Sequence, residues 1–408
     1  MSAPPSSSRS PPPWVSPVQP ATVYGALVKN LLSKLHLADA KFPHPDEKWQ
    51  PNTESNVPPA VQRVALLPKS STRQRIKYHA LVIDCEMVTT RGPPSNPNIN
   101  DLISIAIVDF ISGNVVLHCL VQPTAYVTNW NFRYTGVKPA ILKAAKDDPN
   151  QQVLRGWPAA RAKIFEFADE NTLFLGHALD NDLRILRICT DKVVDSAALT
   201  AHAAFGKDGD GPNRTWSLKG LCKELLGIEI QNKKSSHDCL EDAFATRELI
   251  IWCLTQPEKL KAWGEKSKET FDKDFAKRKE EQRAANELRM LKNREAWIKR
   301  RIVKIDQRMN ETYDEQCARD QYDERPEFNE EQERDFPAYK AQLEKELVEI
   351  DVEHKQKLKE LMQRKHEAKI LKKAEASTPR HAPETAQEGP KDQQQDMLEH
   401  KPGSAAQN

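Results

Sequence analysis

Short apolar runs separated by polar residues recur between residues 78 and 256, and they predict strands and helices there. Leu81, Val82 and Ile83 form an apolar, partly β-branched run, which is typical of a strand buried on both faces of a sheet. Two acidic residues, Asp84 and Glu86, follow with no turn residue between. The pattern therefore predicts a core strand that ends in a pair of carboxylates.

Further apolar segments predict four more strands and three helices. Thr89–Asn100 is expected to be a loop, and a turn at Ser112-Gly113-Asn114 should join the next two strands into an antiparallel meander. A crossover helix at Gln152–Glu170 should bring the strand Leu173–Gly176 parallel to the first. The other predicted elements are strands at Leu102–Phe110, Val115–Gln122 and Lys192–Asp195, and helices at Ser217–Leu226 and from His237 onward. This order predicts an α/β fold, a mixed five-stranded sheet flanked by helices.

The chain outside this region has a different composition. Residues 1–72 begin with a Ser/Pro-rich stretch and are predicted to be a disordered arm. Tyr24–Leu37 can form one helix in this arm, which docks on the domain, frays alone or binds a partner. Residues 73–256 are the predicted globular domain. Residues 257–375 are rich in Lys and Glu and predict a long charged α-helical extension, and residues 376–408 a disordered tail.

Charge is unevenly distributed along the predicted extension. Residues 289–308 carry eight basic and two acidic residues, whereas residues 311–335 carry eleven acidic and three basic ones. Narrow rows of apolar residues accompany these blocks, as in a coiled-coil seam or a helical hairpin. The extension is therefore either a solvated helix, a surface for self-association or a protein partner, or an RNA contact through its basic block.

Composition narrows the protein class. Hydrophobic residues make up 38% and charged residues 29% of the 408 residues, and 28 Pro outnumber 14 Gly, so a compact domain should coexist with solvated segments. The seven Cys form no CxxC pair, which favours reduced thiols over a zinc module. No apolar run approaches the length of a membrane span or a secretory core. We expect a soluble intracellular protein without a membrane partner.

The acidic residues after the first strand suggest a metal site. Residues spaced by two on a strand point to the same side of the sheet, so Asp84 and Glu86 would lie together. Buried like charges need a neutralising cation, and carboxylate oxygens favour Mg²⁺ or Mn²⁺. The alternative is a solvated acidic pair at a strand end. Asp180 and Asp182, in a turn after a second short strand, could supply further oxygen ligands, and His237 and Asp242, five residues apart, could serve the same site.

Three ordered motifs carry a family resemblance: DCEM at Asp84, GHALDNDL at Gly176 and HxxxxD at His237. Together they resemble the DEDDh branch of 3′–5′ exonucleases. They are most similar to its RNA exonuclease group, which includes the interferon-stimulated exonuclease and yeast enzymes that trim ribosomal RNA. The segments Tyr134–Pro139 and Ser217–Gly227 also resemble elements of that group. The resemblance covers roughly residues 78–253 and implies an RNase H-like fold.

The resemblance also implies roles for individual residues. His237 would act as general base, and two Mg²⁺ or Mn²⁺ ions would be held by Asp84, Glu86, Asp182 and Asp242, with Asp84 bridging them. Asp182 rather than Asp180 matches the family's acidic ligand. Met87 and Val88 would bind substrate, with Met87 against the terminal base.

The implied reaction is hydrolysis of RNA from its 3′ end to nucleoside 5′-monophosphates, in RNA processing or turnover such as ribosomal RNA processing. Two alternatives remain: a 3′–5′ exonuclease acting on single-stranded DNA, and an inactive nuclease fold that binds partners through its helical extension. Family analogy favours nuclear or nucleolar residence over the cytoplasm, and Lys299-Arg300-Arg301 could serve as a nuclear address.

Overall fold

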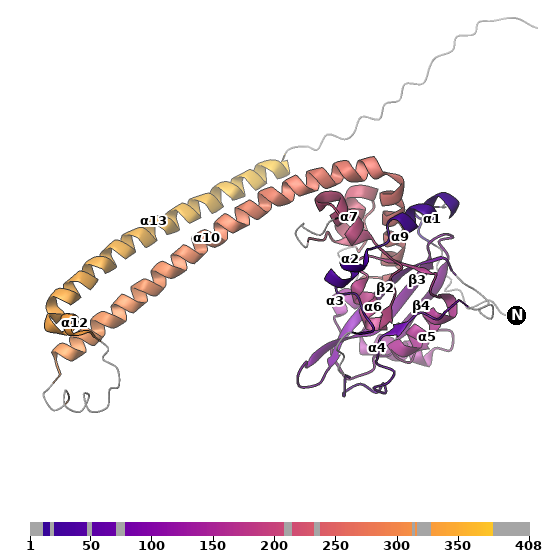
Figure 1. Ribbon diagram of the computed structural model, residues 1–408, viewed down its shortest axis with the longest axis horizontal. Helices are drawn as coiled ribbons and strands as arrows, with labels where there is room; N and C mark the ends of the chain where they lie inside the picture. The colour runs from indigo at the N-terminus through magenta and orange to yellow at the C-terminus, as the bar shows by residue number, and fades with distance from the viewer. Residues whose placement is uncertain are drawn as a thin grey trace, which may run out of the picture. The chain divides into compact units, whose positions relative to one another are not determined.

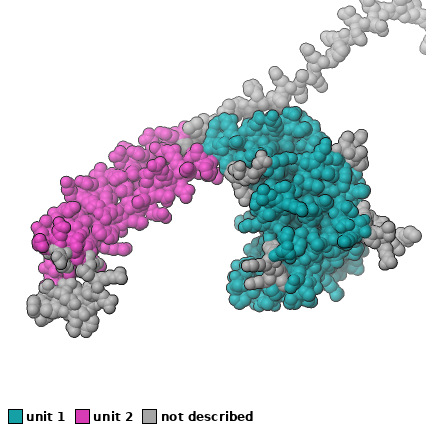
Figure 2. Space-filling model, viewed as in Figure 1, with its two compact units in different colours: residues 1–274 teal, residues 275–408 magenta. Residues whose placement is uncertain are grey.

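The computed structural model describes residues 11–16, 20–46, 51–70, 78–207, 214–231, 237–311, 315 and 328–377. The chain forms two compact units, residues 1–274 and residues 275–408, which are coloured separately in Figure 2. Among the described residues, none of the helices has the length and apolar character that a membrane crossing requires.

A mixed β-sheet forms the centre of the first unit (Figure 1). Its strand order is β6-β4-β3-β2-β7-β9, and β5 pairs with β2 at one side. The strands are β2 (Ala80–Arg91), β3 (Asn98–Asp109), β4 (Val115–Val121), β5 (Val127–Asn129), β6 (Val153–Leu154), β7 (Leu173–Gly176) and β9 (Val193–Asp195). The mixed sheet and the parallel pairing of β7 with β2 are confirmed. The predicted count of five strands was wrong, because β5 and β6 are too short to produce a period-two pattern.

The predicted loop at residues 89–100 was also wrong. The strand β2 continues to Arg91 and β3 already begins at Asn98, so the two form a long antiparallel hairpin. The pairing of Thr90 with Ile99 buries Thr90 at 1% exposure. Polar residues at the end of β2 and the start of β3 therefore belong to the sheet because the two strands pair, which the local sequence did not indicate.

Helices cover both faces of this sheet. Alternate residues of β2 separate the two faces: Ala80 and Val82 pack with α9 (Cys239–Thr255), whereas Leu81 and Ile83 pack with α5 (Trp157–Phe167) and α6 (Asp180–Leu186). Two short strands of this unit, β1 (Ala65–Leu66) and β8 (Ile188–Cys189), pair in parallel. Further helices are α3 (Phe132–Thr135), α4 (Pro139–Asp147), α7 (Ser196–Phe205) and α8 (Leu218–Leu221), the last continued by a π-helical turn at Cys222–Leu226. The sheet is thus the middle layer of the unit.

The N-terminal segment differs from the predicted disordered arm. The predicted single helix is two helices, α1 (Pro20–Lys29) and α2 (Lys34–Asp39), because the N–H of Leu32 donates to the carbonyl of Val193 at 2.9 Å and takes the chain out of the helix. Leu27 is fully buried in the cluster that contains α9. The described residues of this segment therefore contribute to the core.

Replacing Leu27 tests this contribution. Because its side chain is 0% exposed, Leu27→Ala should lower the free energy of unfolding by about 2–5 kcal/mol, measured by urea denaturation. Leu35 is 69% exposed, so Leu35→Ala serves as the matched control and should change stability by less than about 0.5 kcal/mol. Equal stability of the two variants would mean that the arm does not pack on the domain.

The boundary predicted at residue 256 also shifts. The helix α10 (Pro257–Met309) begins within the first unit, where Trp263 is 7% exposed and joins the core cluster of α9. In the second unit, α10 lies beside α13 (Phe336–Ser377), which follows the short α12 (Glu330–Arg334) (Figure 1). An apolar cluster of Ile298, Ile305, Phe328, Leu343 and Ile350 joins them. The second unit is therefore a helical hairpin.

Candidate active site

The strand β2 presents two carboxylates at one end of its buried stretch. By alternation, Asp84 and Glu86 lie on the face that packs against α9. Their cross-strand neighbours, Ala106 and Ser104, are small and leave space above the sheet. The pairing register shifts directly after Glu86, and such bulges often redirect side chains next to active sites.

A tight turn between β7 and α6 delivers Asp182 to the same end of the sheet. A Cβ at Gly176 would lie 2.6 Å from Leu179 Cδ1, so only glycine fits there. Asp195 fixes the turn by accepting from the N–H groups of Ala178 at 3.1 Å and Leu179 at 2.8 Å. Asp182 then reaches Cys85, whose backbone and thiol both hydrogen-bond to its carboxylate.

The start of α9 supplies His237 and Asp242. The backbone N–H of His237 donates to the carbonyl of Tyr134 at 2.8 Å, which anchors the residue ahead of the helix. Its Nδ1 lies 3.7 Å from Asp242 Oδ2 and 3.9 Å from Glu86 Oε1. Gln231 Nε2 donates to Asp242 Oδ2 at 2.8 Å. The structure thus gathers residues from β2 and α9 around one imidazole.

Burial strongly shifts the protonation of this site. Desolvation is the main cause that raises the pKa of Glu86 to about 8, of Asp182 to about 8 and of Asp242 to about 7. The pKa of Asp84 is raised well above its usual value by desolvation and then by repulsion from Asp182, Asp242 and Glu86. Four carboxylates therefore lie close enough to oppose one another's ionisation.

The pKa of the histidine is shifted in the opposite direction to those of the carboxylates. Desolvation, followed by the charge of Lys219, lowers the pKa of His237. The imidazole is therefore mostly neutral near pH 7 and able to accept a proton.

These residues fit a divalent cation. Asp242 Oδ1 is buried and has no hydrogen-bond partner, so one carboxylate oxygen of this group is left unsatisfied. Ligand atoms of Glu86, His237 and Asp242 all lie within 4.8 Å of one another. An oxygen-rich donor set with uncompensated negative charge is the kind that binds Mg²⁺ or Mn²⁺. Of the five predicted residues, Asp84 and Asp182 join this group through their electrostatic coupling.

The two residues predicted to bind substrate, Met87 and Val88, differ in whether a ligand can reach them. Met87 lines a cavity of about 400 Å³ that also reaches Asn181, the residue before Asp182, so it remains available to a ligand. Val88 is 0% exposed and packs with Ile103 and Val137. Its predicted contact with substrate is therefore corrected, since the side chain belongs to the core.

Several contacts of the site were not predicted from the sequence. Cys85, Gln231 and Tyr134 each form a hydrogen bond to a candidate catalytic residue, and none of the three stands next to its partner in the sequence. Lys219 donates to the carbonyl of Gln231 and influences the pKa of His237. The sequence also offers basic residues that could contact RNA. One of them, Arg214, lies over the ring of Trp216. The others, Arg73, Arg75, Lys77, Lys233 and Lys234, lie outside the described residues.

Comparison with known families shows what kind of domain contains these residues. Residues 81–250 match the exonuclease family model. These residues form an exonuclease-family domain. The match contains every candidate catalytic residue, and it confirms the resemblance expected from the sequence.

Curated relatives of the exonuclease domain bear related names. The chain is 29% identical to "RNA exonuclease 3" of Candida albicans over 46% of this chain and 43% of that protein. It is 35% identical to "RNA exonuclease 3" of Emericella nidulans, over 42% of this chain and 28% of that protein. A third relative, "Interferon-stimulated 20 kDa exonuclease-like 2" of Bos taurus, is 29% identical over 58% of this chain and 66% of that protein. The match spans less than half the length of the first five relatives.

Solved structures similar to this chain include the Pan2 pseudoubiquitin hydrolase-RNA exonuclease module of Saccharomyces cerevisiae in complex with A7 RNA. The likeness has a TM-score of 0.38 at 22% identity and covers 52% of this chain and 34% of that one. The Pan2 catalytic unit of Neurospora crassa is similar with a TM-score of 0.36 at 19% identity, and the likeness covers 54% of this chain and 33% of that one.

The raised carboxylate pKa values predict how stability depends on pH without metal. Unfolding returns Glu86 to a pKa near 4.5 and the aspartates to values near 3.8, so the folded state retains protons that the unfolded state has released. The free energy of unfolding should therefore fall as pH rises from about 4 to about 8, by about 1.4 kcal/mol per pH unit for each retained proton.

Urea denaturation in chelator between pH 5 and 8 measures this dependence. Glu86→Gln removes one of the titrating groups and should give a shallower decline than the unaltered protein. Identical pH profiles for the two proteins would contradict burial of Glu86 as a protonated acid.

Proposed function

We propose that this protein is a metal-dependent 3′–5′ exonuclease that hydrolyses RNA to nucleoside 5′-monophosphates. The observation that carries the proposal is the convergence of Asp84, Glu86, Asp182 and Asp242 around His237 within an exonuclease-family domain. The names of the curated relatives favour RNA as the substrate.

The four carboxylates are proposed to hold two divalent cations, Mg²⁺ or Mn²⁺. When bound, such ions would neutralise phosphoryl oxygens, activate water and stabilise the leaving group. Asp84 is the best placed of the four to contact both ions, because its carboxylate interacts with those of Asp182, Asp242 and Glu86. Asp242 would contribute the oxygen that otherwise lacks a partner.

His237 is proposed to take a proton from the attacking water. Its lowered pKa keeps the imidazole unprotonated, and its side chain is 35% exposed, so solvent reaches it. The ring of Tyr134 packs edge-on against the imidazole at 5.6 Å and limits its rotation. Once protonated, the ring would be stabilised by the carboxylates of Glu86 and Asp242.

The terminal nucleotide is proposed to lie beside Met87. Its thioether borders the cavity next to Asn181, and a polarizable sulfur suits contact with the face or edge of an aromatic base. The exonuclease domain needs to bind only a few nucleotides, which agrees with equal numbers of Lys/Arg and Asp/Glu in residues 71–250, 21 of each.

An assay with end-labelled RNA tests direction and cofactor together. With Mg²⁺, RNA labelled at its 5′ end should shorten step by step, and RNA labelled at its 3′ end should release a labelled mononucleotide at once. Chelator should stop both. Release of the 5′ label first, or full activity in chelator, would refute the proposal. A DNA strand of equal sequence as competitor decides between RNA and DNA as the preferred substrate.

We further propose a role in RNA processing or turnover, including that of ribosomal RNA, with nuclear or nucleolar residence. The names of the relatives support action on RNA, and the basic cluster Lys299-Arg300-Arg301 supports nuclear residence. The helical hairpin is proposed to bind a protein partner or a second copy, since Met290, Val348 and Val352 leave apolar surface exposed there. Localisation of a fluorescent fusion with and without the cluster, and sedimentation of the purified chain, examine the two points.

A further inference from the structure

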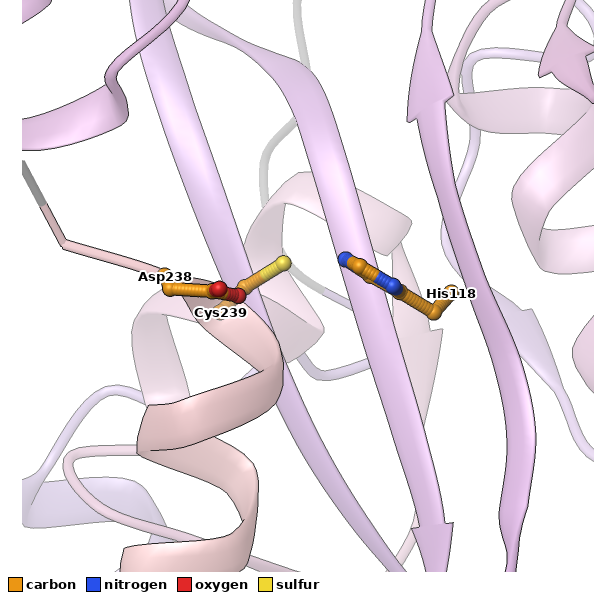
Figure 3. Close-up of side chains that lie close together, drawn as sticks. All are labelled: His118, Asp238 and Cys239. Carbon is orange, nitrogen blue, oxygen red and sulfur yellow. The ribbon is translucent and has the colours of Figure 1, made fainter. Parts of the chain in front are cut away.

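A second group of potential metal ligands shares no residue with the carboxylate site but borders it, since Asp238 and Cys239 interact electrostatically with Asp84 and Glu86. His118 extends from β4, and Asp238 and Cys239 stand at the start of α9 (Figure 3). One ligand atom from each, a ring nitrogen, a carboxylate oxygen and the sulfur, lie within 4.8 Å of one another. Figure 3 shows the sulfur of Cys239 directed toward the imidazole of His118.

The sheet register explains why these side chains meet. His118 pairs with Ala106, and Ala106 pairs with Asp84, so all three lie in one row on the face that α9 covers. His118 is therefore two strands away from Asp84. The methyl group of Ala106 fills little of the space between them, which lets the imidazole approach the helix start.

The helix contributes its two ligands from fixed positions. Asp238 caps α9, with its Oδ1 accepting from the N–H of Leu240 at 3.0 Å. Cys239 is 3% exposed, and its sulfur hydrogen-bonds to the hydroxyl of Ser104 on β3. Two of the three candidate ligands are thus already oriented by other groups, as outer partners orient metal ligands in built sites.

The chemistry of this group differs from that of the carboxylate site. Sulfur and imidazole nitrogen are poor ligands for Mg²⁺, whereas one sulfur, one nitrogen and one carboxylate oxygen form a donor set that suits Zn²⁺. We propose that His118, Asp238 and Cys239 form a second metal site that binds Zn²⁺, with a fourth coordination position open to water.

Coordination needs only small side-chain rotations. A tetrahedral Zn²⁺ lies about 2.0–2.3 Å from its ligands, so the ligand atoms must approach to about 3.5 Å from one another. The thiol of Cys239 releases its proton to solvent as the sulfur–zinc bond forms, and no oxidant or reductant takes part.

Binding at this site would link β4 to the start of α9. Since Zn²⁺ would bind the folded protein in preference to the unfolded chain, the melting temperature should rise by about 5–10 °C at a hundredfold excess over the dissociation constant. The rise in melting temperature on Zn²⁺ binding does not depend on RNA hydrolysis, so it can be tested whether or not the protein is a nuclease.

Cobalt provides a probe that reports the sulfur ligand. We would titrate the full-length protein carrying Asp84→Asn, which weakens binding at the carboxylate site, with Co²⁺ under reducing conditions. A thiolate-to-cobalt charge-transfer band in the near ultraviolet should appear at one equivalent, and Zn²⁺ should displace it. Absence of the band would overturn the proposal.

Three further substitutions assign the band. Cys239→Ser should abolish it, and His118→Ala should weaken Co²⁺ binding by at least the roughly 10–100-fold that loss of an outer partner of a metal ligand costs. Cys119 neighbours His118 on β4 but packs on the opposite face of the sheet, so Cys119→Ser is the matched control and should keep the band. A band that survives Cys239→Ser, or that is unaffected by His118→Ala, would refute the site.

Discussion

Replacing Asp84 with asparagine is expected to abolish metal-dependent RNA hydrolysis and to raise the melting temperature of the metal-free protein. The carboxylate is desolvated although partly exposed, and it is repelled by Asp182, Asp242 and Glu86, so its removal relieves an unfavourable concentration of charge. The same repulsion is what a pair of cations would neutralise. The rate should fall by more than about 10³-fold, beyond the roughly 10²–10³ that a single transition-state contact contributes.

A matched control distinguishes loss of a catalytic carboxylate from loss of any negative charge near the site. Asp180 lies in the first turn of α6 close to Asp182, but it is only half-buried and was assigned no ligand role. Asp180→Asn should retain activity within about tenfold, a loss smaller than removal of a single transition-state contact produces. Single-turnover rates in Mg²⁺ and thermal melts in chelator give both quantities for each variant. Full activity of Asp84→Asn would remove Asp84 from the mechanism.

Replacing His237 with alanine is expected to lower turnover by about 10²–10⁴, the usual contribution of a positioned general base. Metal affinity should change little, because the four carboxylates remain. The prediction separates two roles that geometry brings close together, since the imidazole Nδ1 lies within 4.8 Å of ligand atoms of both Glu86 and Asp242. Titration with Mn²⁺, read by electron paramagnetic resonance, measures affinity independently of rate.

The pH dependence of the rate distinguishes the same two roles. If His237 is the base, the rate of the unaltered protein should fall as pH drops below the lowered pKa of the imidazole, and His237→Ala should lose that limb. If metal affinity collapses in His237→Ala and the rate at saturating Mn²⁺ is normal, His237 is a ligand instead.

The parts of the fold that the sequence predicted well are those with strong local patterns. The apolar run before Asp84 and the short strand Leu173–Gly176 lie where expected, and their parallel pairing follows from the crossover helix between them. The helix α7 was missed because it is buried on most sides, with Ala197, Ala198, Leu199 and Ala204 all covered, so its sequence carries no polar face.

Other features depend on tertiary contacts that local patterns cannot show. Leu27 belongs to the core only because α9 offers an apolar surface to it, and Val88 is buried only because Leu142 of the unpredicted helix α4 covers it. The contacts of Gln231 with Asp242 and of Tyr134 with His237 join residues 11 and 103 positions apart. The site residues were predicted because their motifs resemble a family, whereas the groups that orient them required the structure.

Diffraction from crystals soaked in Mn²⁺ tests the central claim most directly. We predict two anomalous peaks about 4 Å apart, ligated by Asp84, Glu86, Asp182 and Asp242. Density with no peak among these carboxylates at saturating Mn²⁺ would contradict the proposal that they exist to hold paired cations.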